Sequence, residues 1–170
     1  MKTITKEITV YAFEELTQEA KDRAREKYNE QEEFTFLQDD LREYIHEELT
    51  ERGYTHDELT PLYDLSSTQG SGLMFEGTVY DKKGNVYTIK NSGHYTHEKS
   101  TDIEGFNEST GEYKEIDTEK WEEEVYIPIC KIVRDRGYDI IDYTYSEENF
   151  IEMCEANEYT FLSDGTMFNE

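Results

Sequence analysis

Residues 69–93 carry the clearest structural signal in the chain and read QGSGLMFEGTVYDKKGNVYTIKNSG. Apolar and polar side chains alternate on both sides of the turn sequence DKKGN, which is typical of two antiparallel strands joined by a tight turn. We therefore predict a hairpin formed by residues 73–80 and 86–90. Further turn residues, QGSG before it and NSG after it, extend this hairpin into an antiparallel meander over residues 54–99.

Helical periodicity begins on the N-terminal side of this meander. Apolar residues recur every four positions over residues 16–28, and Thr17 is a suitable N-cap. A second helix is predicted over residues 34–52, where Gly53 provides the stop signal. Its apolar face is interrupted by Glu48, which indicates either a slight rotation of the helix or a position at the edge of the core.

Two more helices are predicted after the meander. One follows Thr118 and runs to Gly137, although Pro128 must kink it or divide it in two. A short one is capped by Ser146 and ends at Asn157, a residue type that tolerates the left-handed conformation.

The remaining segments give weaker signals. Residues 4–13 alternate well enough for an opening strand, and residues 159–169 predict a closing hairpin. Residues 100–117 have few apolar anchors, so we expect an exposed loop or a weak hairpin. Because no linker or repeat interrupts the chain, the prediction is a single α+β domain over residues 1–170. Its antiparallel sheet, a meander plus terminal strands, packs against three to four helices.

The acidic balance of the chain is its largest anomaly. The 170 residues hold 41 Asp and Glu against 17 Lys and Arg, a formal charge of −24, while 14% of the residues are aromatic. The aromatic side chains can build a core in a chain that is only 35% hydrophobic. Direct binding to nucleic acid is not expected, because it depends on cationic side chains. The charge favours a basic protein as partner, or serves solubility alone.

Cysteine usage and hydropathy indicate the compartment. Cys130 and Cys154 are the only cysteines, and neither has a metal-binding spacing, so we expect two buried, reduced thiols. We expect no signal peptide and no membrane span, because the first residues lack an apolar run and no apolar stretch is long enough. A cytoplasmic protein is predicted; its oligomeric state is not.

Acidic residues are clustered on the second predicted helix. At 100° per residue, four carboxylates form a stripe with steps of roughly 4.5 to 6 Å, close to the spacing of charges along a nucleic-acid backbone. Like charges at this spacing repel each other, so the stripe is mildly destabilising. It is either a solvated face of an acidic protein or a surface for a basic partner, and its residues are Asp40, Glu43, Glu47 and Glu51.

Two short motifs are also candidate functional sites. His94 and His97 would point to opposite faces of an extended segment, which forbids shared metal binding unless a turn brings them together. The segment Gln69, Gly70, Ser71, Gly72 continues into a strand, unlike a phosphate-binding loop or a nucleophile elbow. We expect a tight turn with positive φ there, and we predict no metal, cofactor or catalytic residues.

Four segments of the chain resemble small phage and prophage accessory proteins that are loosely labelled antitoxin-like. They are VYAFEELTQEAKDRAREKY (10–28), LSSTQGSGLMFEG (65–77), NSGHYTH (91–97) and IEMCEANEYTFLSDGT (151–166). They fit the patterns QGxG followed by MFEG, SGHYxH, and ANEYxFxxDG. The chain departs from the family at Ser71, where Asp is expected, and at Thr96, where Tyr is expected. The resemblance implies a viral or mobile-element origin and an accessory role against a host system.

Three hypotheses of function follow. The leading one is an acidic phage-type protein that binds and inhibits a host nucleic-acid-binding protein, such as a CRISPR or restriction component, with the four carboxylates standing in for phosphates. The second is an antitoxin-like regulatory module that neutralises a toxin by burying aromatic surface. The third is a small enzyme or metal-binding protein that uses His94 and His97.

Overall fold

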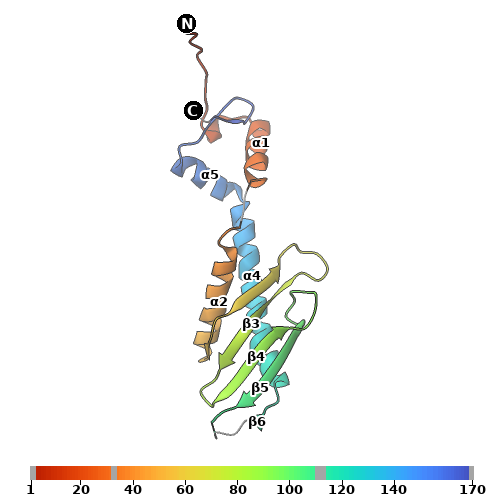
Figure 1. Cartoon of the computed structure of the whole chain (residues 1–170). Coiled ribbons are helices and arrows are strands. Elements are labelled where there is room, and N and C mark those ends of the chain that lie inside the picture. The colour runs from red at the N-terminus through yellow and green to blue at the C-terminus, as the bar shows by residue number, and fades with distance from the viewer. Residues whose placement is uncertain (1–2, 32–33, 110–113, 169–170) are drawn as a thin grey trace. The chain divides into compact units, whose positions relative to one another are not determined.

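The structure is a computed structural model that describes residues 3–31, 34–109 and 114–168. The chain forms an α+β fold, as predicted, with antiparallel strands and several helices (Figure 1). It divides into two compact units. We call Met1–Phe34 with Ile141–Glu170 the terminal unit, and Thr35–Ile140 the central unit. No linker in the sequence marks the border between the two units, and the single domain over residues 1–170 stays a prediction.

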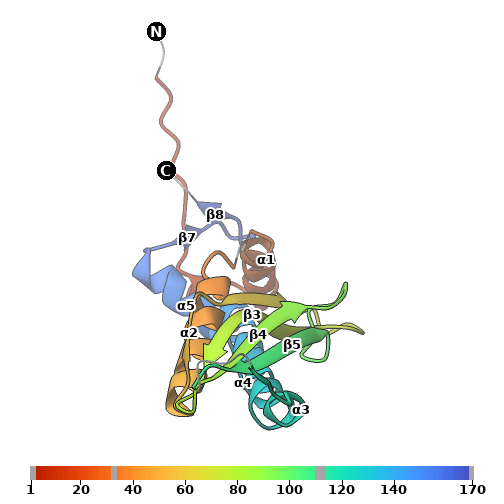
Figure 2. The ribbon, with the colours of Figure 1, turned by 60° about the horizontal axis from the view of Figure 1, so that its bottom comes forward.

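The central unit is built on a six-stranded antiparallel sheet. Strand β3 lies inside it, with β4 on one side and both β1 and β2 on the other, and β5 and β6 continue beyond β4. Figures 1 and 2 show the helices α2 and α4 on one face of this sheet. The strands are β1 (Thr55–His56), β2 (Thr60–Asp64), β3 (Gly72–Tyr80), β4 (Asn85–Asn91), β5 (Thr101–Asn107) and β6 (Lys114–Glu115).

The predicted hairpin is confirmed as β3 and β4. Its turn is closed by Asp81, whose carboxylate accepts hydrogen bonds from the backbone N–H groups of Lys83 and Asn85 at 2.7 and 3.0 Å. Gly84 supplies the positive φ of +82° that the turn requires. Local turn chemistry therefore sets the register of the sheet.

Of the exposed loop or weak hairpin predicted over residues 100–117, the hairpin is confirmed, because β5 and β6 pair antiparallel through two residue pairs; the pairing of β5 with β4 was not predicted. Strand β5 pairs with β4 over seven residues. Gly105 in β5 is buried under Ile116 and Thr118. A Cβ atom at this position would lie within 2.8 Å of both side chains. The strand depends on this tertiary pairing and packing, which its weakly apolar sequence does not show.

Helix α2 (Leu37–Glu51) confirms the second predicted helix. Gly53, with a φ of +82°, follows its end. Leu41, Ile45 and Leu49 are fully buried beneath it.

The third predicted helix is longer than expected and contains a π-helical turn. It consists of α3 (Glu119–Trp121), the π-helical segment η2 (Glu122–Tyr126) and α4 (Ile127–Thr144). The N–H group of Ile127 donates to the carbonyl of Glu122, five residues back. This wide turn directly precedes Pro128 and accommodates its missing N–H group and its bulky ring.

The predicted end of this helix at Gly137 was wrong. Gly137 is buried within α4, and a Cβ atom there would lie 2.7 Å from Leu65 and 3.1 Å from Leu41. The glycine permits close packing in the middle of the helix instead of ending it.

The terminal unit has a separate core. Thr17 and Ser146 cap helices α1 (Gln18–Asn29) and α5 (Glu147–Ala156), as predicted. The closing hairpin is also present, as β7 (Thr160–Phe161) and β8 (Met167–Phe168). A short 3₁₀ helix, η1 (Phe13–Glu15), precedes α1. Buried residues of these elements pack together: Phe13, Leu16, Ala20, Ala24, Phe150, Cys154 and Phe161.

Two predictions at the chain ends were wrong. Residues 3–10 form no strand, and Ile4 is 79% exposed; only Tyr11 makes an isolated antiparallel bridge, to Phe161. The left-handed residue after α5 is Glu158, with a φ of +54°, and not Asn157, whose φ is −104°. In the part of the chain that the structure describes, no helix is long and apolar enough to cross a bilayer.

Candidate functional site

The acidic stripe lies on the exposed face of α2. Its four residues, Asp40, Glu43, Glu47 and Glu51, are all exposed, as predicted from the helical spacing. Within the described ranges, only Glu47 forms an ion pair, with its Oε2 atom 3.0 Å from the Nη1 atom of Arg136. The side chains of Asp40, Glu43 and Glu51 make neither ion pairs nor hydrogen bonds with other described residues. Three of the four predicted carboxylates thus remain available to a partner.

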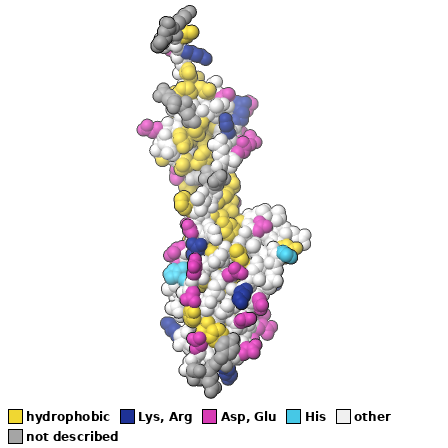
Figure 3. Space-filling model, in the orientation of Figure 1, with side chains coloured by type: hydrophobic (Ala, Val, Ile, Leu, Met, Phe, Trp, Pro, Cys, Tyr) yellow, Lys and Arg dark blue, Asp and Glu magenta, His cyan; other side chains and the backbone are white. Residues whose placement is uncertain are grey.

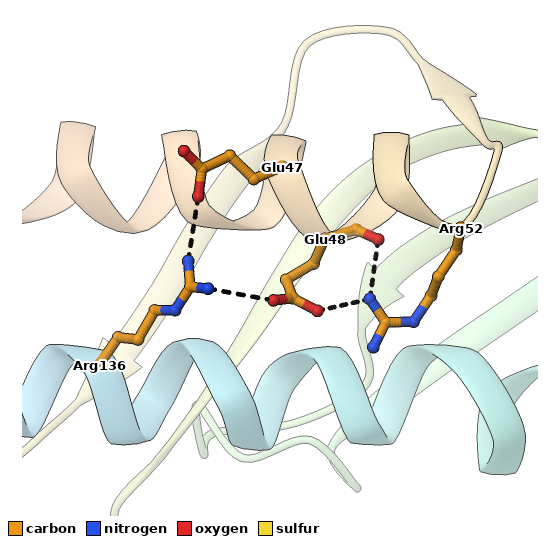
Figure 4. A network of polar contacts seen from close by, with 4 residues as sticks. All are labelled: Glu47, Glu48, Arg52 and Arg136. Carbon is orange, nitrogen blue, oxygen red and sulfur yellow. Dashed lines mark hydrogen bonds and ion pairs between the residues drawn. The ribbon is translucent and has the colours of Figure 1, made fainter.

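Beside this stripe, Glu48 joins α2 to α4 through a network of charges (Figure 4). Its side chain is buried, at 6% exposure, and forms ion pairs with Arg52 and Arg136. The guanidinium of Arg136 also stacks on the ring of Tyr44, with its Cζ atom 4.8 Å from the ring centroid. A buried carboxylate needs such partners, and Glu48 finds them in two arginines that are about one third exposed, so it supports α2 from the edge of the core.

Acidic residues are abundant in both units. The central unit has 24 acidic and 11 basic residues, a net charge of −13, and the terminal unit has 17 and 6, a net charge of −11. Figure 3 shows acidic side chains at many places on the visible face. Negative charge alone therefore does not distinguish the stripe on α2. What distinguishes it is that four carboxylates follow one face of a well-packed helix and that three of them have no partner among the described residues.

A second feature unites the two motifs that the sequence left without a role. Residues of the QGSG turn and of the loop after β4 line one hollow of about 620 Å³. The residues around it are Gln69, Gly70, Ser71, Tyr95, His97 and Ser100. The motifs are some 25 positions apart in the chain and meet only because β3 and β4 form a hairpin.

Glycine is required at this meeting point. Gly70 has a φ of +92°, as the predicted turn demands, and a Cβ atom there would lie 3.1 Å from the Tyr95 ring. A Cβ atom on Gly72 would lie 3.0 to 3.1 Å from His97. The oxygen of the Ser71 hydroxyl accepts from the backbone N–H of Thr68 at 2.8 Å, which closes the turn.

The two histidines of the second motif have different environments. His94 is exposed and is not among the residues that line the hollow. The Nδ1 atom of His97 accepts from the backbone N–H of Lys99 at 3.2 Å, and its Nε2 atom lies 3.4 Å from the buried carboxylate of Glu98. In the described parts of the chain, no three His, Cys, Asp or Glu side chains are grouped so as to hold a metal ion.

The structure also pairs two histidines that the sequence did not connect. The Nδ1 atom of His46 on α2 lies 2.8 Å from the Nε2 atom of His56 on β1. The Nδ1 atom of His56 lies 2.6 Å from the carbonyl oxygen of Asp57, so it donates to that oxygen. Because helix and strand meet only in the fold, the spacing of ten residues carried no signal.

Burial makes both cysteines poor nucleophiles. Cys130 and Cys154 are free thiols and are buried, as predicted. Burial raises the pKa of Cys130, and it raises the pKa of Cys154 to about 11, where the charges of Glu14 and Glu155 contribute further. Neither thiol is poised as a thiolate near neutral pH.

Comparisons of the chain with protein-family models, with curated proteins and with solved structures found no match. The resemblance to phage accessory proteins, and the role that it implies, therefore stay predictions. The site must be interpreted from its own geometry.

Proposed function

We propose that this chain is an interaction protein that binds a basic protein surface through the acidic stripe of α2. Its partner is a host nucleic-acid-binding protein, and the complex blocks that protein as a phage-type accessory factor would, in the host cytoplasm. The observation that carries this proposal is the set of three exposed carboxylates with no partner among the described residues, Asp40, Glu43 and Glu51.

The rigidity of α2 supports this role. The helix is held from below by buried leucine and isoleucine side chains and from the side by Glu48, which contacts Arg52 and Arg136. A surface that is already ordered loses little conformational freedom on binding. The carboxylates are thus presented at fixed spacing, as phosphates are along a nucleic-acid strand.

The charge of the whole chain supports the same reading. A formal charge of −24 attracts basic surfaces over distances comparable with the Debye length and accelerates encounter with them. It repels nucleic acid itself. A complex made in this way depends strongly on salt, because added ions screen the charges on both partners.

An antitoxin-like role is the second candidate, and one observation favours it. Phe36, at the start of α2, is 73% exposed, although a side chain of this type is usually buried. A partner that covers Phe36 would be held by apolar contact. Such a complex would be little affected by salt or by loss of the carboxylates.

Capture from the lysate of a candidate host separates these roles. The bait is the full chain, tested beside a variant with Asp40→Lys, Glu43→Lys and Glu51→Lys. The matched control makes the same change of charge on the terminal unit, at the exposed residues Asp142, Glu148 and Glu155. We expect a nucleic-acid-binding protein to be retained by the wild type and by the control, and lost by the α2 variant. Equal retention by the α2 variant, with loss on Phe36→Ala, would favour the antitoxin-like role.

A further inference from the structure

The hollow between the two motifs has polar walls and one aromatic residue. Gln69, Ser71 and Ser100 provide amide and hydroxyl groups, and the Tyr95 side chain is 64% exposed. No Lys or Arg is among the residues that line it. Together with the acidic surroundings, these walls do not suit an anionic ligand such as a phosphate.

Behind the wall formed by His97 lies a buried carboxylate. Glu98 is only 3% exposed, and its Oε2 atom has no hydrogen-bond partner among the described residues. The Nε2 atom of His97 is within ion-pair distance at 3.4 Å, but the contact does not meet the geometry of a hydrogen bond. A buried carboxylate oxygen that lacks a donor is rare, because its burial costs solvation that nothing in the fold restores.

One cation of α4, Arg134, interacts electrostatically with Glu98 but forms no hydrogen bond with it. Arg134 is sensitive to the charge of Glu98, which contributes to its raised pKa, but the main cause of that rise is its hydrogen bonding to Asp135. Its guanidinium donates two hydrogen bonds to Asp135, at 2.8 and 3.0 Å. The Oγ1 atom of Thr96, in the same loop as Glu98, is also buried and has no hydrogen-bond partner in the described part of the chain. Two unsatisfied oxygens thus lie in the segment that forms one side of the hollow.

His97 connects the hollow with Glu98. Because its Nδ1 atom accepts from Lys99, the neutral ring carries its proton on Nε2, toward the carboxylate. The imidazole thereby lines the hollow and also faces the buried charge. Gly72 allows this position, since a Cβ atom there would lie 3.0 Å from the ring.

We propose that this hollow binds an organic cation, an ammonium or guanidinium group, with Glu98 as its counter-charge. The Tyr95 ring supplies a cation–π contact, and the side-chain oxygens of Gln69 and Ser100 accept hydrogen bonds from the nitrogen. The cation comes from a free polyamine or from a Lys or Arg side chain of a protein partner. In the second case the site deepens the proposed function and rests on it.

Nuclear magnetic resonance titration with spermidine and with N-acetylarginine methylamide tests the site directly. We expect saturable shifts of the backbone amides of Gly70, Ser71, Tyr95 and Ser100. Glu98→Gln should weaken binding at least about 10-fold while the fold is kept, because it removes the buried negative charge that lies behind His97. Tyr95→Ala, at the exposed rim, should weaken binding independently. Glu108→Gln, which neutralises an exposed carboxylate elsewhere, is the matched control and should bind as the wild type.

The results of these titrations and of partner binding discriminate the possibilities. Equal binding by the wild type and Glu98→Gln, shifts spread over α2, or equal shifts with neutral N-butylacetamide would each overturn the proposal. The α2 charge-reversal variant should still bind spermidine in the hollow. Its spermidine binding therefore tests the proposed cation site separately from the proposed α2 interface. Loss of partner binding in Glu98→Gln assigns the cation to the partner, whereas intact partner binding with loss of spermidine assigns it to a free polyamine.

Discussion

The hydroxyl of Tyr126 forms hydrogen bonds with both backbone groups of Phe75. It accepts from the Phe75 N–H at 3.1 Å and donates to the Phe75 carbonyl at 3.0 Å. The pairing of β3 with β4 begins only at Gly77, and on the other edge Phe75 faces Pro61, which has no N–H group. The Tyr126 hydroxyl therefore satisfies the backbone groups of Phe75 that no neighbouring strand reaches.

Tyr126→Phe should destabilise the central unit by about 2–3 kcal/mol, because two buried backbone groups lose their partner. Burial of the hydroxyl also raises its pKa, so it stays a donor at all physiological pH values. Urea unfolding, followed by the fluorescence of Trp121, the only tryptophan, measures the effect.

Tyr80→Phe is the control for this substitution. It removes a hydrogen bond of 2.7 Å to Asp57 that is exposed to water, and it should cost less than about 1 kcal/mol. If both variants lost the same free energy of unfolding, the buried hydrogen bonds to Phe75 would contribute no more than an exposed one, which would contradict this prediction.

Glu48→Gln should loosen the attachment of α2 to α4. The substitution keeps the shape of the side chain but removes the charge that faces Arg52 and Arg136. Both arginines are about one third exposed and can be hydrated, so the expected loss is about 1–2 kcal/mol, less than for a fully buried pair. Glu47→Gln, which removes one exposed ion pair, should cost under about 0.5 kcal/mol in the same urea experiment. The reverse order of the two losses would contradict the structure.

Gly165→Ala should disrupt the terminal unit. The residue has a φ of +86°, and a Cβ atom would lie 2.1 Å from the carbonyl oxygen of Ala20. We expect a loss of at least about 2 kcal/mol, seen as faster hydrogen exchange of the amides of α1 and α5. Gly93→Ala meets no atom within 4 Å and should leave the exchange rates as they are. Unchanged exchange in Gly165→Ala would mean that the hairpin does not pack on α1 as described.

The two thiols should react slowly with iodoacetamide in the native protein. Alkylation needs the thiolate, and a raised pKa lowers the thiolate fraction at any pH below it. As pH rises, Cys154, with its pKa of about 11, should react before Cys130, whose pKa burial raises further. Peptide mapping by mass spectrometry follows each site, and unfolding in urea should make both fast. Native labelling of Cys130 ahead of Cys154 would refute this order.

Local signals in the sequence were enough for the elements that local chemistry determines. The caps at Thr17 and Ser146, and the turn closed by Asp81, were predictable because their hydrogen bonds lie within a few residues. The pairing of β5 with β4 was not predicted, because it depends on tertiary contacts that the sequence of β5 does not show. The role of Gly137 was predicted wrongly because a glycine can either end a helix or permit close packing within it. The close approach of Leu65 and Leu41 shows that Gly137 has the second role.

The same distinction applies to the candidate site. Exposure of the stripe on α2 follows from helical periodicity, which the sequence displays. The hollow could not be predicted, since Gly70 and Tyr95 meet only after β3 and β4 have paired. The pairing of His46 with His56, and the burial of Glu98 without a donor, likewise require the packed fold.

The dissociation constant of the captured partner, measured as a function of salt, tests the acidic interface most directly. For the wild type we expect affinity to fall at least about 10-fold between low and physiological ionic strength, because the carboxylates of α2 act on the partner through charge. The variant with Asp40→Lys, Glu43→Lys and Glu51→Lys should bind weakly at every salt concentration. An affinity that neither salt nor this variant changes would contradict the proposed interface.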